Sequence, residues 1–389
     1  MKTKGQMPEL RFPEFYSAWD SNRLGNRASF TKGKGISKAD INENGNLPCI
    51  RYGELYTHYG TVIDEILSFT NGDVSSLVLS EGDEVLMPAS GETAIDIATA
   101  SVIKQKGVAL GGDLNIIKSD IDGAFLAHYL SGRNKTRIAR LAQGISVIHL
   151  YSSQLKLLEL AIPSLKEQRK IATFLAAVDA KLDALRRKRA LLAEYKRGVM
   201  QKLFTQEIRF VRDDDTPYPN WEDRELGEIL SYQQPTNYLV SSTEYDDIFD
   251  TPVLTAGKTF VLGYTDEKDG IFKEFLPAII FDDFTTASKY VDFPFKAKSS
   301  AMKILTSSES TTQIKVVYEF MQLLNFSVGS HKRHWISVYQ FLAIPFPSLQ
   351  EQQKIAEFLT AIDNKITAVD QQISQMATFK KGLLQQMFV

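Results

Sequence analysis

The chain has 389 residues, of which 43% are hydrophobic, 11% aromatic and 24% charged. This composition excludes a disordered chain and, at roughly 100 to 200 residues per domain, predicts two or three folded domains. The 45 basic and 47 acidic residues give a formal net charge of -2, which excludes a strongly basic protein and leaves only local basic surfaces, and the single cysteine excludes an internal disulfide framework.

The segment that begins at Met1 is polar and lacks the apolar core of a signal peptide, and no run of about 18 apolar residues occurs. We therefore expect a cytoplasmic protein that does not associate with membranes. Beyond His331 and His334, the histidines show no metal-ligand spacing with cysteine or acidic residues, so no metal site is predicted.

The first predicted domain, residues 1–161, is rich in β-strands. Short β-prone runs at residues 61–63, 77–79, 85–87 and 108–110 are separated by glycine-rich and aspartate-rich turns. Residues 121–130 form its clearest helical stretch. These features predict an α+β domain dominated by short strands.

A duplicated segment follows this domain. Residues 163–204 recur at 347–388 with a constant offset of 184, no gap and 19 identities in 42 positions. Ser164 and Ser348 each stand three residues before a glutamate, which predicts a capping box at the start of each helix. The sequence thus predicts a long helix at 162–205 and a second at 347–389.

Apolar residues in both copies alternate at spacings of four and three, with a mean period of about 3.5, as in the seam of a left-handed coiled coil. Charged residues at Arg189, Lys196 and Lys380 interrupt this seam and predict a fixed register at some cost in stability. A pair of core helices in a globular bundle is the alternative. The predicted seam residues are Ile171, Leu175, Val178, Leu182, Leu185 and Leu192 in the first copy and Ile355, Leu359, Ile362, Ile366, Val369 and Met376 in the second.

The second predicted domain, residues 206–346, begins where the first helix ends and finishes where the second begins. Because domain termini usually lie close together, the two helices should be antiparallel. Its clearest helical stretch is 314–324, and it shares little identity with the first domain beyond a preamble in which Trp19 and Trp221 each precede a Leu-Gly pair. We predict two β-rich domains separated by two long antiparallel coiled-coil helices, with an approximate internal two-fold repeat.

Three features together cover nearly the whole chain. They are the duplicated Pro-Ser-Leu-x-Glu-Gln-x-Lys-Ile-Ala-x-Phe-Leu segments at 163–175 and 347–359, the two Trp-x4-Leu-Gly openings, and the alternating order of domains and helices. Together they resemble the specificity subunit of type I restriction-modification systems. The resemblance implies that each β-rich domain is a target recognition domain, which reads one half of an asymmetric bipartite DNA site, and that the helices set the spacing between the halves.

The same resemblance implies partners: double-stranded DNA, two methyltransferase (modification) subunits and the restriction, or motor, subunits. It implies that this chain is not an enzyme and holds no cofactor. S-adenosylmethionine, and ATP with Mg, would be bound by the partner subunits of an adenine-methylating, ATP-dependent complex. Consistent with this, the sequence contains no Asn/Asp-Pro-Pro-Tyr/Phe tetrapeptide of an adenine methyltransferase.

Contacts to DNA phosphates require clustered basic side chains, and three clusters occur in the two domains. They are Lys32 and Lys34; Arg133, Lys135, Arg137 and Arg140; and His331, Lys332, Arg333 and His334. A solvated surface is the alternative for each cluster. The basic run at 186–189 lies either over the DNA between the half-sites or in solvent.

Base contacts require hydrogen-bonding side chains, and one polar loop in each domain follows a β-prone run at an equivalent position. The predicted residues are Ser90, Glu92 and Thr93 in the first loop and Thr285, Thr286, Ser288 and Lys289 in the second. Ordinary polar turns are the alternative. A coiled-coil scaffold with two protein-binding β-rich domains is the rival to the DNA-reading function as a whole.

Overall fold

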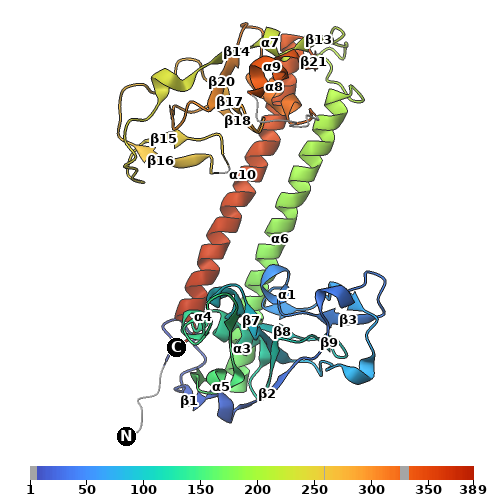
Figure 1. Cartoon of the computed structure of the whole chain (residues 1–389), viewed down its shortest axis with the longest axis vertical. Helices are drawn as coiled ribbons and strands as arrows, with labels where there is room; N and C mark the ends of the chain where they lie inside the picture. Colours follow the sequence, from blue (N-terminus) through green and yellow to red (C-terminus); the bar gives the residue numbers. More distant parts are fainter. Residues whose placement is uncertain (1–6, 258, 325–332) are drawn as a thin grey trace. The chain divides into compact units, whose positions relative to one another are not determined.

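A computed structural model describes residues 7–257, 259–324 and 333–389. It divides into two compact units: unit 1 holds Met1–Arg187 and Asp370–Val389, and unit 2 holds Lys188–Val369. Two long helices, α6 (Leu165–Phe204) and α10 (Leu349–Gln386), each contribute one half to each unit (Figure 1). The four-part division at 161/162, 205/206 and 346/347 remains a prediction from sequence pattern.

Unit 1 is built on a five-stranded sheet with the order β2-β10-β6-β8-β4 and a three-stranded sheet with the order β5-β3-β9. Two further pairs, β1 with β12 and β7 with β11, are antiparallel. The strands are β1 (Asp20–Arg23), β2 (Ala28–Lys32), β3 (Leu47–Ile50), β4 (Val62–Ile63), β5 (Ser68–Thr70), β6 (Glu84–Pro88), β7 (Ser90–Gly91), β8 (Ser101–Ile103), β9 (Ala109–Leu110), β10 (Leu114–Ser119), β11 (Ile148–His149) and β12 (Glu159–Ile162).

Unit 2 repeats this plan. Its four-stranded sheet has the order β14-β20-β17-β18, and its three-stranded sheet the order β16-β15-β19. In both three-stranded sheets the central strand has one antiparallel and one parallel neighbour. The strands are β13 (Glu222–Glu225), β14 (Leu230–Gln233), β15 (Thr251–Leu254), β16 (Val261–Thr265), β17 (Ala278–Asp282), β18 (Ser288–Val291), β19 (Lys296–Ala297), β20 (Met302–Ser307) and β21 (Ala343–Phe346), the last paired with β13.

Helices are short apart from α6 and α10, as predicted. Unit 1 has α1 (Glu54–Thr57), α2 (Ala94–Ile97), α3 (Gly123–Ser131), α4 (Lys135–Ala139) and α5 (Ser152–Leu155), with 3-10 turns η1 (Leu24–Asn26), η2 (Lys38–Asp40) and η3 (Val74–Ser76). Unit 2 has α7 (Leu226–Ile229), α8 (Ile314–Met321) and α9 (His334–Ser337), with η4 (Pro235–Tyr238) and η5 (Tyr339–Phe341).

The helical predictions at 121–130 and 314–324 correspond to α3 and α8. The predicted strand at 77–79 is wrong, because only Leu79 pairs, through an isolated bridge to Ala109. An apolar run beside a turn fits a strand by propensity, but the neighbouring 3-10 turn η3 leaves too few residues for a ladder.

The long helices pair as predicted. In unit 1 the first half of α6 lies beside the second half of α10, and Lys380 contacts Asp179 at 2.5 Å. In unit 2 the other halves meet, and Lys196 contacts Asp363 at 2.8 Å. Because these are the same two positions of the duplicated sequence, the helices are antiparallel and the internal repeat is confirmed.

The predicted seam is buried for the most part. Leu192, Ile366 and Met376 are half-buried, and the other nine seam residues of the prediction are buried. Among the charged seam positions, Lys196 and Lys380 form the pairs just described, and the Arg189 side chain is exposed. Lys196 and Lys380 therefore favour one register through carboxylates on the opposite helix, as expected for polar residues in a coiled-coil interface.

The end of each long helix completes the core of a β-rich domain. In unit 1 Phe388 stacks on Tyr129 of α3 with ring centroids 4.8 Å apart, and Trp19 packs edge-on against the same ring. In unit 2 Phe204, the residue that matches Phe388, packs edge-on against Phe320 of α8 at 5.3 Å. Burying such a large ring contributes about 2 to 3 kcal/mol, so each domain depends on the helix end that packs against it.

The predicted capping box at Ser164 is wrong in its second half, and the one at Ser348 is wrong in both halves, because the buried Ser348 hydroxyl has no hydrogen-bond partner among the described residues. Ser164 Oγ accepts a long bond from the Glu167 N–H at 3.4 Å, but the Glu167 carboxylate accepts from the Arg11 guanidinium at 2.7 and 2.8 Å and from Trp19 Nε1 at 3.2 Å. Glu167 is 2% exposed, and a buried carboxylate requires such donors. The Glu167 carboxylate therefore bonds to Arg11 and Trp19 rather than to the backbone N–H of Ser164.

Unit 2 repeats this arrangement at matched positions. The Glu351 carboxylate, which is fully buried, accepts from Arg209 at 3.2 and 2.7 Å and from Trp221 Nε1 at 2.6 Å. We call each set a glutamate lock: Glu167 with Arg11 and Trp19, and Glu351 with Arg209 and Trp221. Each lock ties the segment before the first strand of a domain to the first turn of the long helix that follows that domain.

A glutamine one residue further on joins the same helices to α3 and α8. Gln168 accepts from the N–H of Asp122, the N-cap of α3, at 2.9 Å and donates to Pro163 O at 2.8 Å. Gln352 accepts from the N–H of Gln313, the N-cap of α8, at 2.8 Å and donates to Pro347 O at 2.8 Å. The duplicated glutamine therefore links the N-cap of α3 or α8 to the first turn of the following long helix.

The two junctions differ at one buried position. In unit 1 His128 of α3 faces Asp179 at 3.9 Å, and burial, followed by the charge of Lys380, lowers the pKa of His128 to about 3. In unit 2 the equivalent residue of α8 is Glu319, which pairs with Lys196 at 2.6 Å and Lys315 at 2.7 Å. Unit 1 thus has a neutral side chain where unit 2 has a charged one.

We expect Glu351→Ala to lower the free energy of unfolding by about 3 kcal/mol, because Arg209 and Trp221 lose a buried charged partner. The midpoint of urea unfolding, followed by circular dichroism, measures this. Glu357→Ala, an exposed position on the same helix, is the matched control and should change little. Equal shifts in both variants would show that the lock contributes nothing.

We expect acid to destabilise the protein through His128. Its pKa is about 3 when folded and about 6.5 when unfolded, so the unfolded chain binds the extra proton and stability falls as the pH drops below 6.5, by about 2 kcal/mol at pH 5. His128→Gln should show a smaller loss of stability between pH 7 and pH 5 than the parent chain. His58→Gln, at an exposed position, should keep the parent's pH dependence; the same dependence in both variants would contradict the assignment.

Candidate nucleic-acid interface

The first predicted recognition loop follows β6 and leads into α2. Ser90 is 4% exposed and donates its hydroxyl to Asp113 Oδ2 at 3.1 Å. Thr93 is the N-cap of α2, where its hydroxyl accepts from the Asp96 N–H at 3.1 Å and donates to the Asp96 carboxylate. Glu92 is exposed. Two of the three predicted side chains are therefore engaged within the domain, and Glu92 has its carboxylate in solvent.

The predicted basic stretch of the first domain lies beside this loop, because α4 packs on α2. Lys135 donates from Nζ to Thr99 Oγ1 at 3.2 Å, and burial lowers its pKa. Arg137 donates to Glu159 O at 3.1 Å, and Arg133 and Arg140 are exposed. The structure thus brings two separately predicted sets of residues onto adjoining helices.

Lys32 and Lys34 are exposed at the end of β2. Gly33 between them lies against the chain at residues 110–111, where an added Cβ would be 1.9 Å from Gly111 O, so no other residue fits without rearrangement. The Lys34 N–H donates to Leu110 O at 2.9 Å. This close approach holds the two lysines at the edge of the five-stranded sheet.

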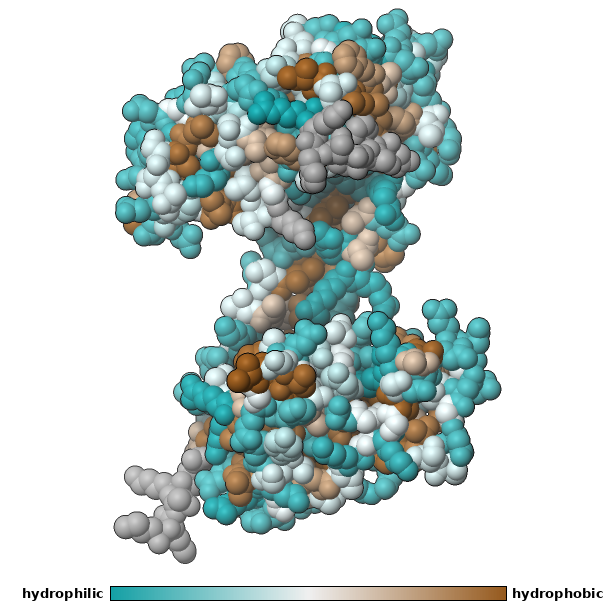
Figure 2. All heavy atoms as spheres, in the orientation of Figure 1, coloured by the Kyte–Doolittle hydropathy of each residue, from teal (hydrophilic) through white to brown (hydrophobic). Residues whose placement is uncertain are grey.

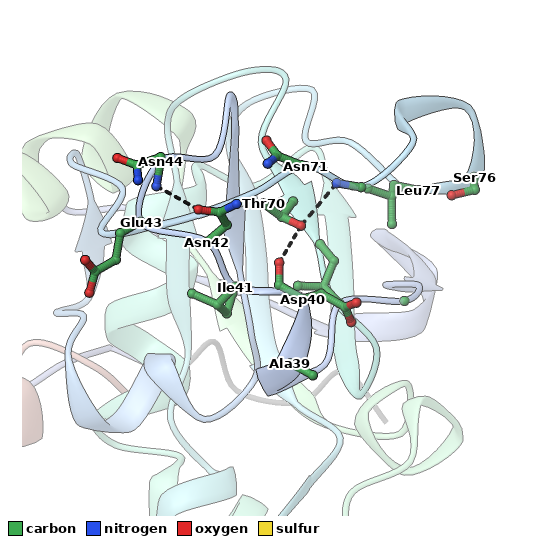
Figure 3. Close-up of a pocket in the computed structure, with 13 residues that line it drawn as sticks. Ala39, Asp40, Ile41, Asn42, Glu43, Asn44, Thr70, Asn71, Ser76 and Leu77 are labelled. Atoms are coloured by element: carbon green, nitrogen blue, oxygen red, sulfur yellow. Dashed lines mark hydrogen bonds between the residues drawn. The ribbon is translucent and has the colours of Figure 1, made fainter.

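A cavity of about 780 Å³ adjoins this edge and was not predicted from the sequence. Side chains from the loops at 39–44 and 70–77 line it (Figure 3). Asn42 accepts from the Asn44 N–H at 2.9 Å, and Thr70 donates to Asp40 O at 2.7 Å, so the loops are ordered by their own polar groups. Amide side chains suit the adenine edge, and the amide-rich sequence at 42–46 is the signal that could have identified it.

The second predicted recognition loop follows β17, the strand equivalent to β6. Thr285 and Lys289 are exposed, Ser288 accepts from Gln322 Nε2 at 2.8 Å, and Thr286 has a φ of 60°, a left-handed conformation that is uncommon outside glycine. Thr285 lies in the turn between β17 and β18, whereas Lys289 lies in β18 opposite Ile280.

Asp283 joins this loop to the predicted basic segment of the second domain. Its carbonyl accepts from the His334 N–H and its carboxylate from the Trp335 N–H, both at 2.9 Å, and Lys303 lies 3.6 Å from the same carboxylate. Arg333 is exposed at the start of α9, whereas His334 is buried. His331 and Lys332 lie outside the described residues. In both domains, then, the loop and the basic segment are neighbours.

The described residues contain no group of three or more histidine, cysteine, aspartate or glutamate side chains arranged to hold a metal ion. Cys49 is buried, and its burial raises the pKa of the thiol to about 11. Within the described ranges no helix is both long enough and apolar enough to cross a membrane. Hydrophilic residues cover most of the face shown in Figure 2, and hydrophobic residues form separate small patches there.

Comparisons with known proteins agree with this architecture. A family model for the type I restriction modification DNA specificity domain matches residues 16–194 and 218–377. A crystal structure of the S subunit of a type I restriction-modification system from M. genitalium superposes with a TM-score of 0.69 at 16% identity and covers 99% of both chains, which shows a shared fold.

Two specificity subunits are similar in sequence. That of the type I restriction enzyme EcoR124I/EcoR124II from Escherichia coli is 48% identical over 163 residues, which is 40% of this chain and 40% of that protein. A putative MjaX specificity subunit from Methanocaldococcus jannaschii is 26% identical over 287 residues, which is 67% of this chain and 64% of that protein. The chain thus spans less than two thirds of the length of either relative.

The two matches to one family model each include a β-rich domain and most of the long helix that follows it. Together they cover more than half of the chain, in agreement with the duplicated locks and the shared strand order. The chain belongs to the family of type I restriction modification DNA specificity domains.

Proposed function

We propose that this chain is the non-catalytic, DNA-reading subunit of a type I restriction-modification complex. Each β-rich domain contacts one half of an asymmetric bipartite site on double-stranded DNA. The observation that carries this proposal is that the main sheets of the two domains share the order of four strands, β2-β10-β6-β8 and β14-β20-β17-β18, while the loops after β6 and β17 differ in sequence. A shared frame with unlike loops suits the reading of two unlike half-sites.

Exposed polar side chains near the ends of β6 and β17 support the proposed base reading. Glu92 in the first domain, and Thr285 and Lys289 in the second, are exposed and carry the donors and acceptors that distinguish base pairs in the major groove. The neighbouring basic residues, Arg133 and Arg140 in the first domain and Arg333 in the second, suit the phosphates on either side. His334 contacts its own domain through its backbone and suits a structural role.

The duplicated junctions support the proposed partner binding. The glutamate locks and the Lys–Asp pairs between the helices occur twice with the same residue types, and the locks are buried, so they act by giving the two junctions the same internal frame. Two junctions built alike suit two copies of one partner, for which the methyltransferase subunit is the candidate, with the restriction or motor subunits added to that complex. S-adenosylmethionine, the flipped base, and ATP with Mg would be held by those partners. This chain would recognise the DNA sequence and set the distance between the two half-sites.

A genome-wide methylation map tests the proposal. Cells that express this chain with its cognate methyltransferase subunit should gain one new bipartite methylated motif, absent from cells that express the methyltransferase alone. Exchange of residues 206–346 for the second domain of a relative should change one half of the motif only. A complex that methylates no bipartite motif would exclude the DNA-reading function and favour a protein scaffold, and a change in both halves would exclude the modular account.

The helices are proposed to set the distance between the half-sites. Insertion of one heptad between Leu185 and Leu192, together with one between Val369 and Met376 at the matched positions of α10, lengthens each helix by about 10 Å and keeps the seam in phase. The methylation map should then show both half-sites unchanged and a spacer longer by a few base pairs. An unchanged spacer would show that the helices do not act as a ruler.

A further inference from the structure

A cavity of about 490 Å³ lies within unit 1, where the first domain meets the two long helices. Its wall comes from α2 and α4, from the segment between α3 and α4, and from both long helices. The lining residues are Ile95, Ser131, Gly132, Lys135, Thr136, Leu182, Arg186, Ala377, Lys380, Lys381, Leu384 and Gln385. The cavity therefore brings Lys135, from the predicted basic stretch of the domain, near Arg186, from the basic run of α6. The sequence analysis treated these two features separately.

The cavity is positively charged. Four of its lining residues are cationic, Lys135, Arg186, Lys380 and Lys381, and none of the described residues that line it is acidic. Asp179 lies nearby and pairs with Lys380 at 2.5 Å. His128, which faces Asp179, is neutral at pH 7 because its pKa is lowered to about 3.

The remaining charges around the cavity do not cancel this excess. Arg186 contacts Asp183 at 3.0 Å, but both side chains are more than half exposed, so solvent screens the pair. Lys135 donates to the hydroxyl of Thr99, and burial lowers the pKa of its ammonium group, an effect that the charge of Asp96 partly opposes. A partly desolvated cation is stabilised when a further anion binds beside it.

The neutral lining also fits a phosphate. Thr136 and Gln385 carry hydroxyl and amide groups of the kinds that donate to phosphate oxygens, whereas the Ser131 hydroxyl donates to Ala100 O at 2.8 Å within the domain. Leu182 and Leu384 add apolar side chains to the lining. The cavity thus brings ammonium, guanidinium, hydroxyl and amide groups together in one place.

We propose that this cavity binds a backbone phosphate of the DNA next to the half-site read by the first domain. The inference rests on the proposed function and extends it to one phosphate contact, made jointly by the domain and the helices. Double-stranded DNA is favoured over an acidic protein segment because α2, which contributes Ile95, directly follows the loop that carries Glu92. DNA bound at that loop would continue across α2 and α4.

The site belongs to unit 1 only. At the offset of the internal repeat, Lys380 and Lys381 correspond to Lys196 and Arg197, but Arg186 corresponds to an acidic residue, Asp370. Lys196 is moreover surrounded by Glu319 and Asp363. The matched positions therefore lack the excess of positive charge, and Arg197, which corresponds to Lys381 in the repeat, provides a control position.

The test uses the complex of the full chain with its methyltransferase subunit and a duplex that carries its methylated motif. Arg186→Gln and Lys381→Gln should each weaken binding roughly three- to tenfold at about 0.1 M salt and reduce the slope of log K against log salt by about one. The methylated motif and the unfolding midpoint should not change. Arg197→Gln should keep the parent affinity and slope.

Neutral methylphosphonate linkages, placed one at a time along the duplex, identify the phosphate. One position should weaken binding by the parent complex and have little further effect on Lys381→Gln. Unchanged slopes of log K against log salt in both cavity variants would overturn the inference. Loss of methyltransferase binding with an unchanged slope would also overturn it, because the cavity would then bind an acidic segment of the partner protein. If the parent complex itself reads no bipartite motif, the proposed function fails, and that result is distinct from a failure of the cavity variants alone.

Discussion

The arrangement of each unit depends on one buried carboxylate in the first turn of a long helix. Glu167 and Glu351 are almost completely removed from water, and a carboxylate in that environment is tolerated only with charged or N–H donors around it. The donors are Arg11 and Trp19 in one unit and Arg209 and Trp221 in the other, all from segments that precede the first strand of a domain. Satisfying the carboxylate therefore brings the start of each domain to the helix that follows its end.

The junctions between domain and helix are alike in the two copies, whereas the loops beyond the sheets differ. Residues at the junctions keep their type in both copies because each takes part in packing or in a buried polar bond, as with Gln168 and Gln352. The loops beyond the sheets are free of that constraint and have diverged. The exception is the buried position held by His128 and Glu319, where the charge balance between α3, α8 and the helices differs. Each domain is thus adapted to its own junction as well as to its own surface.

Periodicity and duplication predicted the long helices, their seam and their antiparallel pairing, because these depend on spacing along the sequence. The capping boxes failed because a Ser-x-x-Glu pattern is equally compatible with a glutamate that turns to a distant arginine. Propensity also misassigned residues 77–79, where only Leu79 pairs with Ala109. The bond network that joins Asp283 to the start of α9 spans about fifty residues and has no local pattern. Such partners follow from tertiary packing, so sequence reasoning found the loops and the basic segments but not their association.

The position of Phe388 has a consequence for biosynthesis. The core of unit 1 includes Leu383, Met387 and Phe388, whereas all of unit 2 comes from the continuous stretch Lys188–Val369. On a ribosome that adds about 5 to 20 residues per second, the first domain emerges and then waits roughly 10 to 40 seconds for the helix that completes it. During that interval the rings of Phe125 and Tyr129 lack their partner and present an apolar surface. The domain synthesised first is therefore the last to finish folding.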